Sequence, residues 1–149
     1  MAVNCMKRGV CMIPVQTSDL SLTAVQGDEP SVRWAGGYAT YGGSGSTLSS
    51  TVYFEIEPGG RLGWHTDSTE ETQVIIAGSG EIQRDDGNNA VTVGDVFVLP
   101  EGVRHDLVNN GTELLRAVAF FSNGVVTQIF DNVMLPPDGH ILGSPNSQH

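Results

Sequence analysis

Apolar and polar residues alternate in short runs along much of the chain. The segment 48–56 alternates throughout, and further apolar runs occupy 71–77, 95–99 and 114–121. Alternation with a period of two is typical of β-strands that bury one face. No segment keeps the 3.6-residue period of an amphipathic helix, so the pattern predicts an all-β fold.

Turn residues separate these runs at short, even intervals. Pro58-Gly59-Gly60, Asp86-Gly87-Asn88-Asn89 and Pro100-Glu101-Gly102 are examples, among 19 Gly and 7 Pro in total. Many short strands joined by such turns are typical of a β-sandwich or β-barrel. We expect the other strands at 31–41 (interrupted by Gly36-Gly37), 63–67, 81–85, 90–93, 103–108 and 125–130.

The length of 149 residues favours a single domain. We expect residues 1–30 to form an N-terminal arm with short strands and residues 31–131 to form the barrel. Residues 132–149 are rich in Pro and Gly, and we expect a C-terminal tail that is partly irregular.

Composition and charge narrow the functional classes. A formal net charge of −10 repels phosphate backbones, so nucleic acid is not an expected partner. No run approaches the roughly 20 apolar residues of a membrane span, and the first residues carry no recognisable secretory signal. Cys5 and Cys11 lack metal-site or redox spacing, and we expect free thiols. These features together predict a cytoplasmic protein.

Two segments, Gly59–Gly78 and Gly94–Asn109, carry the candidate chemistry. Because side chains alternate along a strand, His65 and Asp67 should share one face, and Glu71 should share a face with Gln73. His105 comes from a third strand. Imidazole nitrogen and carboxylate oxygen suit Fe, Mn, Ni, Cu or Zn better than calcium. The sequence therefore predicts one divalent metal ion per chain.

These residues resemble, in order and spacing, the two motifs of the cupin superfamily. The first motif, G-x5-H-x-H-x3,4-E-x6-G, corresponds to Gly59, His65, Asp67, Glu71 and Gly78. The second motif, G-x5-P-x-G-x2-H-x3-N, corresponds to Gly94, Pro100, Gly102, His105 and Asn109. The resemblance covers the central half of the chain. It implies a small single-domain cupin with a jelly-roll β-barrel, which forms a homodimer.

The chain departs from the first motif at Asp67, where the family usually has a second histidine. The resemblance implies that His65, Glu71 and His105 are metal ligands and puts Asp67 at the fourth ligand position. A bound Asp67 would give two neutral and two anionic ligands. An unbound Asp67 would be a candidate general base. Both alternatives stay open at this point.

Three further residues are candidates for contact with a substrate. Gln73 lies on the face of Glu71 and would either contact substrate and move a proton or be a hydrogen-bonded core amide. Tyr53 would line the pocket if its face of the strand is the inner one. Arg61 has the parity of His65, so it would either bind an anionic group or lie at the surface. Residues expected on the outside or away from the site are Trp64, Glu70, Arg104 and His140.

The first-choice function is a metal-dependent enzyme acting on a small organic molecule, namely a non-haem dioxygenase or related oxidoreductase. The alternative enzyme is a redox-free isomerase, epimerase or lyase in which Asp67 or Gln73 moves a proton. A third possibility, from a different class, is a small-molecule-binding or sensor barrel without turnover. Dependence on oxygen separates the two enzymes, and ligand binding without turnover identifies the third class.

Overall fold

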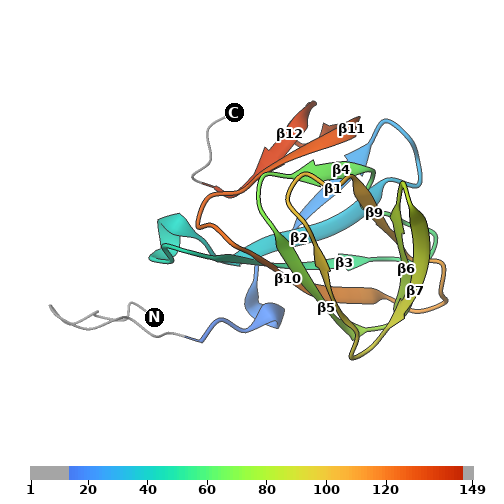
Figure 1. Cartoon of the computed structure of the whole chain (residues 1–149), viewed down its shortest axis with the longest axis horizontal. Helices are drawn as coiled ribbons and strands as arrows, with labels where there is room; N and C mark the ends of the chain where they lie inside the picture. Colours follow the sequence, from blue (N-terminus) through green and yellow to red (C-terminus); the bar gives the residue numbers. More distant parts are fainter. Residues whose placement is uncertain (1–13, 146–149) are drawn as a thin grey trace, which may run out of the picture.

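The chain folds into one strongly curled antiparallel sheet, seen in Figure 1 as ribbons that wrap around a common interior. This computed structural model describes residues 14–145. The elements are η1 (Thr17–Asp19), β1 (Thr23–Gly27), β2 (Arg33–Thr40), η2 (Gly42–Ser44), β3 (Ser50–Ile56), β4 (His65–Asp67), β5 (Glu71–Ala77), β6 (Ser79–Arg84), β7 (Gly87–Thr92), β8 (Val96–Leu99), β9 (His105–Val108), β10 (Leu115–Phe121), β11 (Thr127–Leu135) and β12 (Gly139–Gly143).

The strands pair in the order β7-β6-β9-β4-β11-β1-β2-β3-β10-β5-β8, and β12 pairs with β11. The sheet curls until side chains from β6 and β9 meet those from β3, β5 and β10 in one core cluster, which includes Ile56, Ile75, Leu107 and Leu115. All four of these side chains are at most 1% exposed. The all-β prediction and the jelly-roll barrel are therefore confirmed.

The alternation read from the sequence decides which faces point inward. On β3, Phe54 and Ile56 enter the core cluster, so Tyr53 and Glu55 lie on the outer face. On β5, Glu71, Gln73 and Ile75 are buried and point the same way, as their parity predicted.

Two regions differ from the strand pattern expected from the sequence. β2 runs continuously through Gly36 and Gly37, because β1 and β3 pair with it on either side and hold the backbone extended. β11 continues to Leu135 and is followed by β12, where the sequence favoured a partly irregular tail. Many residues of this hairpin are half-buried or exposed, so the apolar alternation that marks a strand is weak there. The cysteines Cys5 and Cys11 lie outside the described residues.

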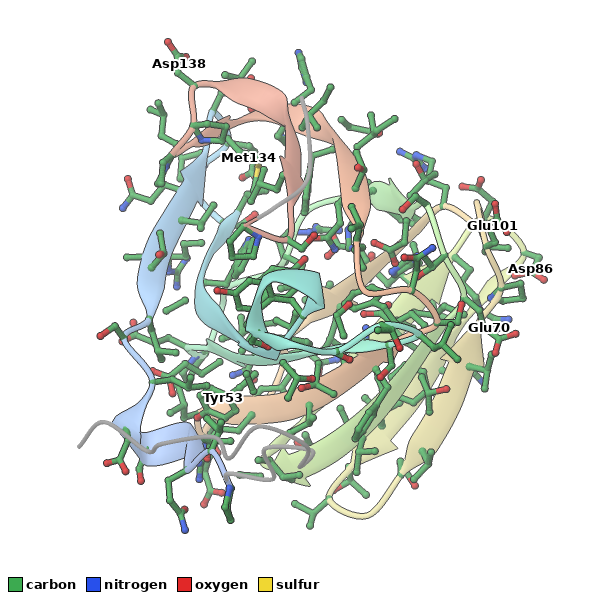
Figure 2. The ribbon with its side chains drawn as sticks, turned by 90° about the vertical axis from the view of Figure 1, so that its left-hand side faces the viewer. Tyr53, Glu70, Asp86, Glu101, Met134 and Asp138 are labelled. Carbon is green, nitrogen blue, oxygen red and sulfur yellow. The ribbon has the colours of Figure 1, made fainter. Side chains whose placement is uncertain are left out.

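The outer surface carries the acidic residues and one apolar face. Figure 2 shows Glu70, Asp86 and Glu101 projecting from loops, and the exposure of Glu70 confirms its expected position. The outer face of β5, β8 and β10 exposes large apolar side chains, namely Ile76, Val96, Val98 and Phe120. Between residues 14 and 145, no helix has the length and apolarity needed to cross a membrane.

Candidate metal centre

Adjacent strands bring the two motif histidines together. β4 pairs with β9 so that His65 lies directly opposite His105, and the ring centroids are 4.3 Å apart. Both side chains are 1% exposed. The ring of Phe130 stacks on His65 at a centroid distance of 4.5 Å, which fixes the plane of that imidazole. The two rings therefore occupy defined positions inside the barrel.

Backbone carbonyls set the tautomer of both histidines. His65 Nδ1 lies 2.7 Å from the carbonyl oxygen of Gly63, and His105 Nδ1 lies 2.7 Å from that of Val103. Because a carbonyl oxygen only accepts, each Nδ1 carries a proton, and in the neutral imidazole each Nε2 keeps the lone pair that can bind a metal. Gly63 has a φ of 98°, a conformation that favours glycine, and its N–H donates to Asp106 Oδ1. The sequence thus directs both Nε2 atoms into the barrel.

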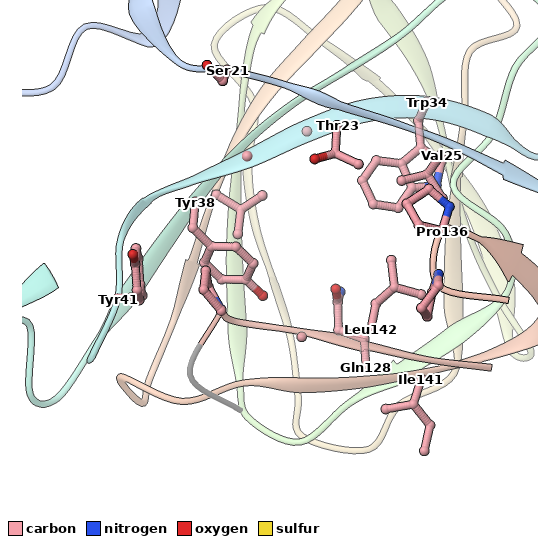
Figure 3. A pocket seen from close by; sticks show the side chains of 16 residues that line it. Ser21, Thr23, Val25, Trp34, Tyr38, Tyr41, Gln128, Pro136, Ile141 and Leu142 are labelled. Atoms are coloured by element: carbon pink, nitrogen blue, oxygen red, sulfur yellow. The ribbon is translucent and has the colours of Figure 1, made fainter. Parts of the chain in front are cut away.

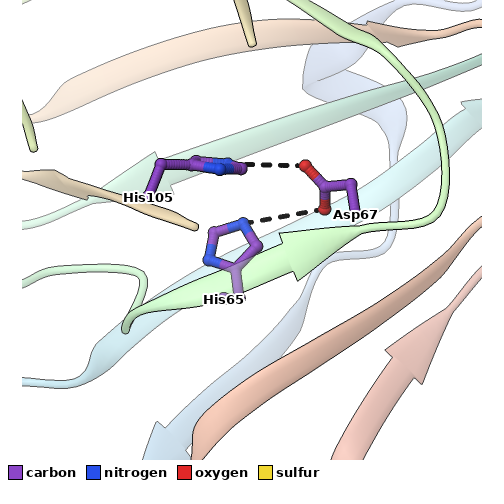
Figure 4. Close-up of side chains that lie close together, drawn as sticks. All are labelled: His65, Asp67 and His105. Atoms are coloured by element: carbon purple, nitrogen blue, oxygen red, sulfur yellow. Dashed lines mark ion pairs between the residues drawn. The ribbon is translucent and has the colours of Figure 1, made fainter. Parts of the chain in front are cut away.

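Asp67 completes a compact group with the two histidines (Figure 4). Its Oδ1 lies 3.7 Å from His65 Nε2, and its Oδ2 lies 3.4 Å from His105 Nε2. Gln128 Nε2 donates to Asp67 Oδ1 at 2.9 Å, and the N–H of Gly102 donates to the Asp67 carbonyl at 3.1 Å. One ligand atom from each of His65, Asp67 and His105 lies within 4.8 Å of the others.

Glu71 approaches the same point from across the barrel. Its Oε1 lies 3.3 Å from His105 Nε2 and accepts a hydrogen bond from Gln73 Nε2 at 3.1 Å. The strands that carry His65 and Glu71 do not pair with each other: β5 pairs with β8 and β10, while β4 pairs with β9 and β11. The short segment between Asp67 and Glu71 crosses between the two walls, so the carboxylate converges with the histidines by facing them.

The donor set fits a divalent metal ion. Asp67 Oδ2 and His105 Nε2 are buried and have no hydrogen-bond partner among the described residues. Metal–ligand distances near 2.1 Å put neighbouring ligand atoms about 3.4 Å apart in a tetrahedral site. His105 Nε2 lies 3.3 Å from Glu71 Oε1 and 3.4 Å from Asp67 Oδ2, and His65 Nε2 lies 3.7 Å from Asp67 Oδ1. These three distances are close to the tetrahedral value. Two neutral imidazoles and carboxylate oxygen form a set suited to first-row transition metals and zinc.

Burial and mutual charge shift the pKa values of these groups strongly. Burial, followed by the charge of His105, lowers the pKa of His65 to about 4. Burial, followed by the charge of Asp67, raises the pKa of Glu71 to about 7. Burial also opposes charge on His105, but the Glu71 and Asp67 carboxylates outweigh it and raise its pKa to about 9. The carboxylates therefore favour a positive charge at the point that His105 Nε2 faces.

A cavity of about 480 Å³ is lined by Trp34, Tyr38 and Gln128 among others (Figure 3), and Gln128 bonds Asp67. A narrow continuation of about 30 Å³, the size of one water molecule, reaches His65 and Glu71. Trp34, Val52 and Gln128 line both spaces, so the continuation joins the cavity to the ligand side chains.

Two of the predicted substrate contacts lie elsewhere. The Tyr53 hydroxyl donates to Glu55 Oε2 at 2.8 Å and accepts from Arg116 Nε at 2.6 Å, on the outer face of β3. Arg61 Nε donates to Asp106 Oδ2 at 2.6 Å and its Nη2 donates to Gln83 Oε1 at 3.0 Å. Neither residue lines the cavity.

Gln73 and Arg104 lie on the faces that their parity predicted. Gln73 is fully buried beside Glu71 and orients that carboxylate, without lining the cavity. Arg104 stacks over Trp64 at 4.3 Å from the ring centre and pairs with Asp131, on the outer surface as predicted. His140 is exposed, and its Nδ1 lies 3.0 Å from the carbonyl oxygen of Phe130.

Tyr38 and Gln128 are site residues that the sequence did not single out. The Tyr38 hydroxyl is buried at the cavity without a hydrogen-bond partner among the described residues. Burial, and then the charges of Asp67 and Glu71, raise the pKa of Tyr38 above its ordinary value. Tyr38 and Trp34 are four residues apart and so lie on the same face of one continuous strand. The sequence did not indicate this, because we expected the strand to be interrupted at the glycines between them. Gln128 lies opposite Asp67 through β-pairing between distant segments, for which the sequence carries no signal.

Comparisons with known proteins agree with this architecture. The family described as Cupin domain matches residues 52–121, which include both motifs. The polyketide cyclase RemF from Streptomyces resistomycificus is 20% identical, with a TM-score of 0.62 over 74% of this chain and 78% of that one. A predicted oxalate decarboxylase from Thermotoga maritima is 17% identical, with a TM-score of 0.65 over 74% of this chain and 99% of that one.

A third similar structure belongs to a longer protein. Oxalate decarboxylase from Bacillus subtilis is 22% identical, with a TM-score of 0.55 over 61% of this chain, which spans 26% of that protein. No match was found among curated protein sequences. At these identities the similarity is one of fold, and it confirms the resemblance read from the two motifs.

Proposed function

We propose, on the premise that this chain contains a cupin domain, that it is a metal-dependent enzyme acting on a small organic molecule by non-haem dioxygenase chemistry. Cupin-like barrels with different activities are similar to this chain, so the proposal depends on the site and not on the fold.

One observation carries the proposal. His65, His105 and Asp67 place two imidazole nitrogens and one carboxylate oxygen within 4.8 Å of one another inside the barrel. A site of two histidines and one carboxylate that keeps open positions is typical of non-haem Fe(II) oxygenases. The small continuation of the cavity against His65 and Glu71 leaves room on the open side.

The residues around the centre have separable roles in this proposal. His65, His105 and Asp67 hold the metal, and Glu71 approaches it from the opposite wall. Gln128 orients Asp67, and Gln73 orients Glu71 through the hydrogen bonds described above. A divalent iron bound by these residues would supply oxygen and Lewis-acid chemistry. Phe54, Leu62 and Phe121 of the apolar core line the space beside the site.

The direct test is oxygen consumption by the Fe(II)-loaded protein with a panel of small aromatic and aliphatic alcohols, ketones and diketones. We expect uptake with at least one compound and no uptake by His105→Ala, whose Nε2 faces both carboxylates. His140→Ala is the matched control, because this histidine is exposed and away from the centre. Equal uptake by wild type and His105→Ala would refute the assignment.

A second candidate, redox-free isomerase or lyase chemistry, is supported by a different observation. The Tyr38 hydroxyl and Asp67 Oδ2 are both buried and accept or donate no hydrogen bond within residues 14–145, so a proton donor and a proton acceptor are available at the site. Turnover by Zn(II)-loaded protein under nitrogen would favour this candidate over the dioxygenase. Ligand binding with no turnover under either condition would favour a binding or sensor protein.

A further inference from the structure

We propose that the cavity beside the metal centre binds an uncharged, planar aromatic molecule whose hydroxyl or carbonyl oxygen is hydrogen-bonded by Tyr38. The proposal deepens the function proposed above, because this molecule would be the substrate class of the same site. It rests on the shape of the cavity, its charge and one unpartnered hydroxyl.

The shape comes from three successive inward positions on β2. Trp34, Gly36 and Tyr38 share one face of the strand and all line the cavity, with the glycine between the two rings. Gly36 does not have a positive φ, so its backbone conformation does not require glycine. A Cβ there would lie 3.0 Å from Trp34 Cζ3 and 3.2 Å from Phe54 Cβ. A Cβ would therefore meet atoms already in place, and glycine lets the Trp34 ring lie close to the strand. The open space of the cavity lies between the rings of Trp34 and Tyr38, which Figure 3 shows on opposite sides of it, and we call this space the slot.

The wall of this slot is rigid and aromatic. Trp34 Nε1 donates to the carbonyl oxygen of Leu62 at 3.1 Å, which fixes the edge of the indole. The indole stacks against Phe130 at a centroid distance of 6.4 Å, and Phe130 stacks on His65. A flat ligand that packs against Trp34 would continue this row of rings toward the metal centre.

The charge of the cavity excludes an anionic ligand. None of the 16 residues that line it within the described part of the chain is charged. The two arginines nearest in sequence are engaged elsewhere: Arg33 donates to the carbonyl of Pro58, and Arg61 pairs with Asp106. The carboxylates of Asp67 and Glu71 balance the charge of a divalent ion. An oxalate or phosphate ester would therefore find no free counter-charge, whereas an uncharged molecule loses little hydration on entry.

The Tyr38 hydroxyl supplies the polar contact. It is buried, lines the cavity and has no hydrogen-bond partner among the described residues. A buried hydroxyl without a partner is unfavourable, and a ligand oxygen that accepts its proton removes that cost. Burial, and then the charges of Asp67 and Glu71, hold the pKa of Tyr38 above its ordinary value, so the hydroxyl stays protonated and acts as the donor.

Naphthol and naphthalene sulfonate make a suitable pair of probes, because they share the same two rings and differ in charge. Binding is measured by fluorescence titration of the metal-free and the Zn(II)-loaded protein. We expect naphthol to bind and the sulfonate to bind at least about tenfold more weakly. Tyr38→Phe should weaken naphthol binding about tenfold through the lost hydrogen bond, and Gly36→Leu should abolish it, because the added side chain would collide with the Trp34 ring and displace it from the wall of the slot. Tyr53→Phe is the control and should bind as wild type does, because its hydroxyl is on the outer face.

Circular dichroism and zinc content show whether each variant is folded, and Gly36→Ala replaces Gly36→Leu if the latter is not. Sulfonate binding as tight as naphthol binding, or full naphthol affinity in both Tyr38→Phe and the folded Gly36 variant, would overturn the proposal. Naphthol binding that depends on Tyr38 without zinc loading would support the aromatic site and contradict the metalloenzyme. Zinc loading with no naphthol binding would support the metal centre and overturn the aromatic site.

Discussion

Replacing Arg61 by Met should destabilise the barrel, because this arginine neutralises a carboxylate that cannot reach water. Asp106 is fully buried, and Arg61 Nε lies 2.6 Å from its Oδ2. The N–H of Gly63 also donates to Asp106, at 3.0 Å from Oδ1. Breaking a buried ion pair by removing one partner costs about 3–5 kcal/mol. Arg61 is 26% exposed, so solvent moderates this loss, and we expect about 2–4 kcal/mol.

Thermal unfolding followed by circular dichroism measures this loss. At roughly 2–4 °C per kcal/mol for a chain of this size, the midpoint should fall by about 5–15 °C. Arg104→Met is the matched control, because Arg104 pairs with Asp85 and Asp131 at the surface, where such pairs contribute about 0–1 kcal/mol. A loss in Arg61→Met no greater than in Arg104→Met would refute the structural role assigned to Arg61.

The loss should also depend on pH. Burial raises the pKa of Asp106 above its ordinary value, and Arg61 opposes this shift. An acid whose pKa is raised by folding costs stability at pH values above its unfolded pKa, and protonation removes the cost as the pH falls. The pKa should rise further without Arg61, so the destabilisation should be full at neutral pH and smaller in mildly acid solution. A loss that is independent of pH would contradict this explanation.

Three other predictions concern separate parts of the molecule. Asp67→Asn should weaken zinc binding more than Gln73→Ala does, as measured by isothermal titration, because Asp67 faces both Nε2 atoms whereas Gln73 only orients Glu71. Asn109→Ala should destabilise the fold by about 2–4 kcal/mol in urea titration without removing the metal, because the buried amide bonds to two carbonyls and one N–H of neighbouring loops. The homodimer implied by the cupin resemblance stays a prediction; light scattering should give twice the chain mass for wild type, and Val98→Lys, on the exposed apolar face, should reduce it.

Much of the fold and of the centre could be predicted because both depend on local patterns. The period-two alternation placed Glu71 and Gln73 on the same buried face, and the spacing of His65 and Asp67 put both side chains into the interior. The motif residue Asn109 proved to be a structural amide, which agrees with its place at a turn.

The positions of Arg61, Tyr53 and Gln128 could not be predicted, because they depend on pairing between distant strands. A single sequence carries no local signal for that pairing. The parity of Arg61 is that of His65, but its segment forms isolated bridges to residues 32 and 108 and directs the side chain to Asp106. Tyr53 could be placed only when the packing of β3 and β10 had decided the inner face. Gln128 reaches Asp67 through the register of β11 with β4.

Elemental analysis of the purified protein, with His65→Ala, His105→Ala and His140→Ala beside it, tests the central claim most directly. Each protein is supplied in turn with Fe(II), Mn(II), Ni(II), Cu(II) and Zn(II), and its folding is checked by circular dichroism. We predict about one metal ion per chain in wild type and in His140→Ala, and loss of that ion in both folded variants of the buried histidines. A folded wild-type protein that retains none of these metals, or a metal content unchanged in His65→Ala and His105→Ala, would contradict the metal centre.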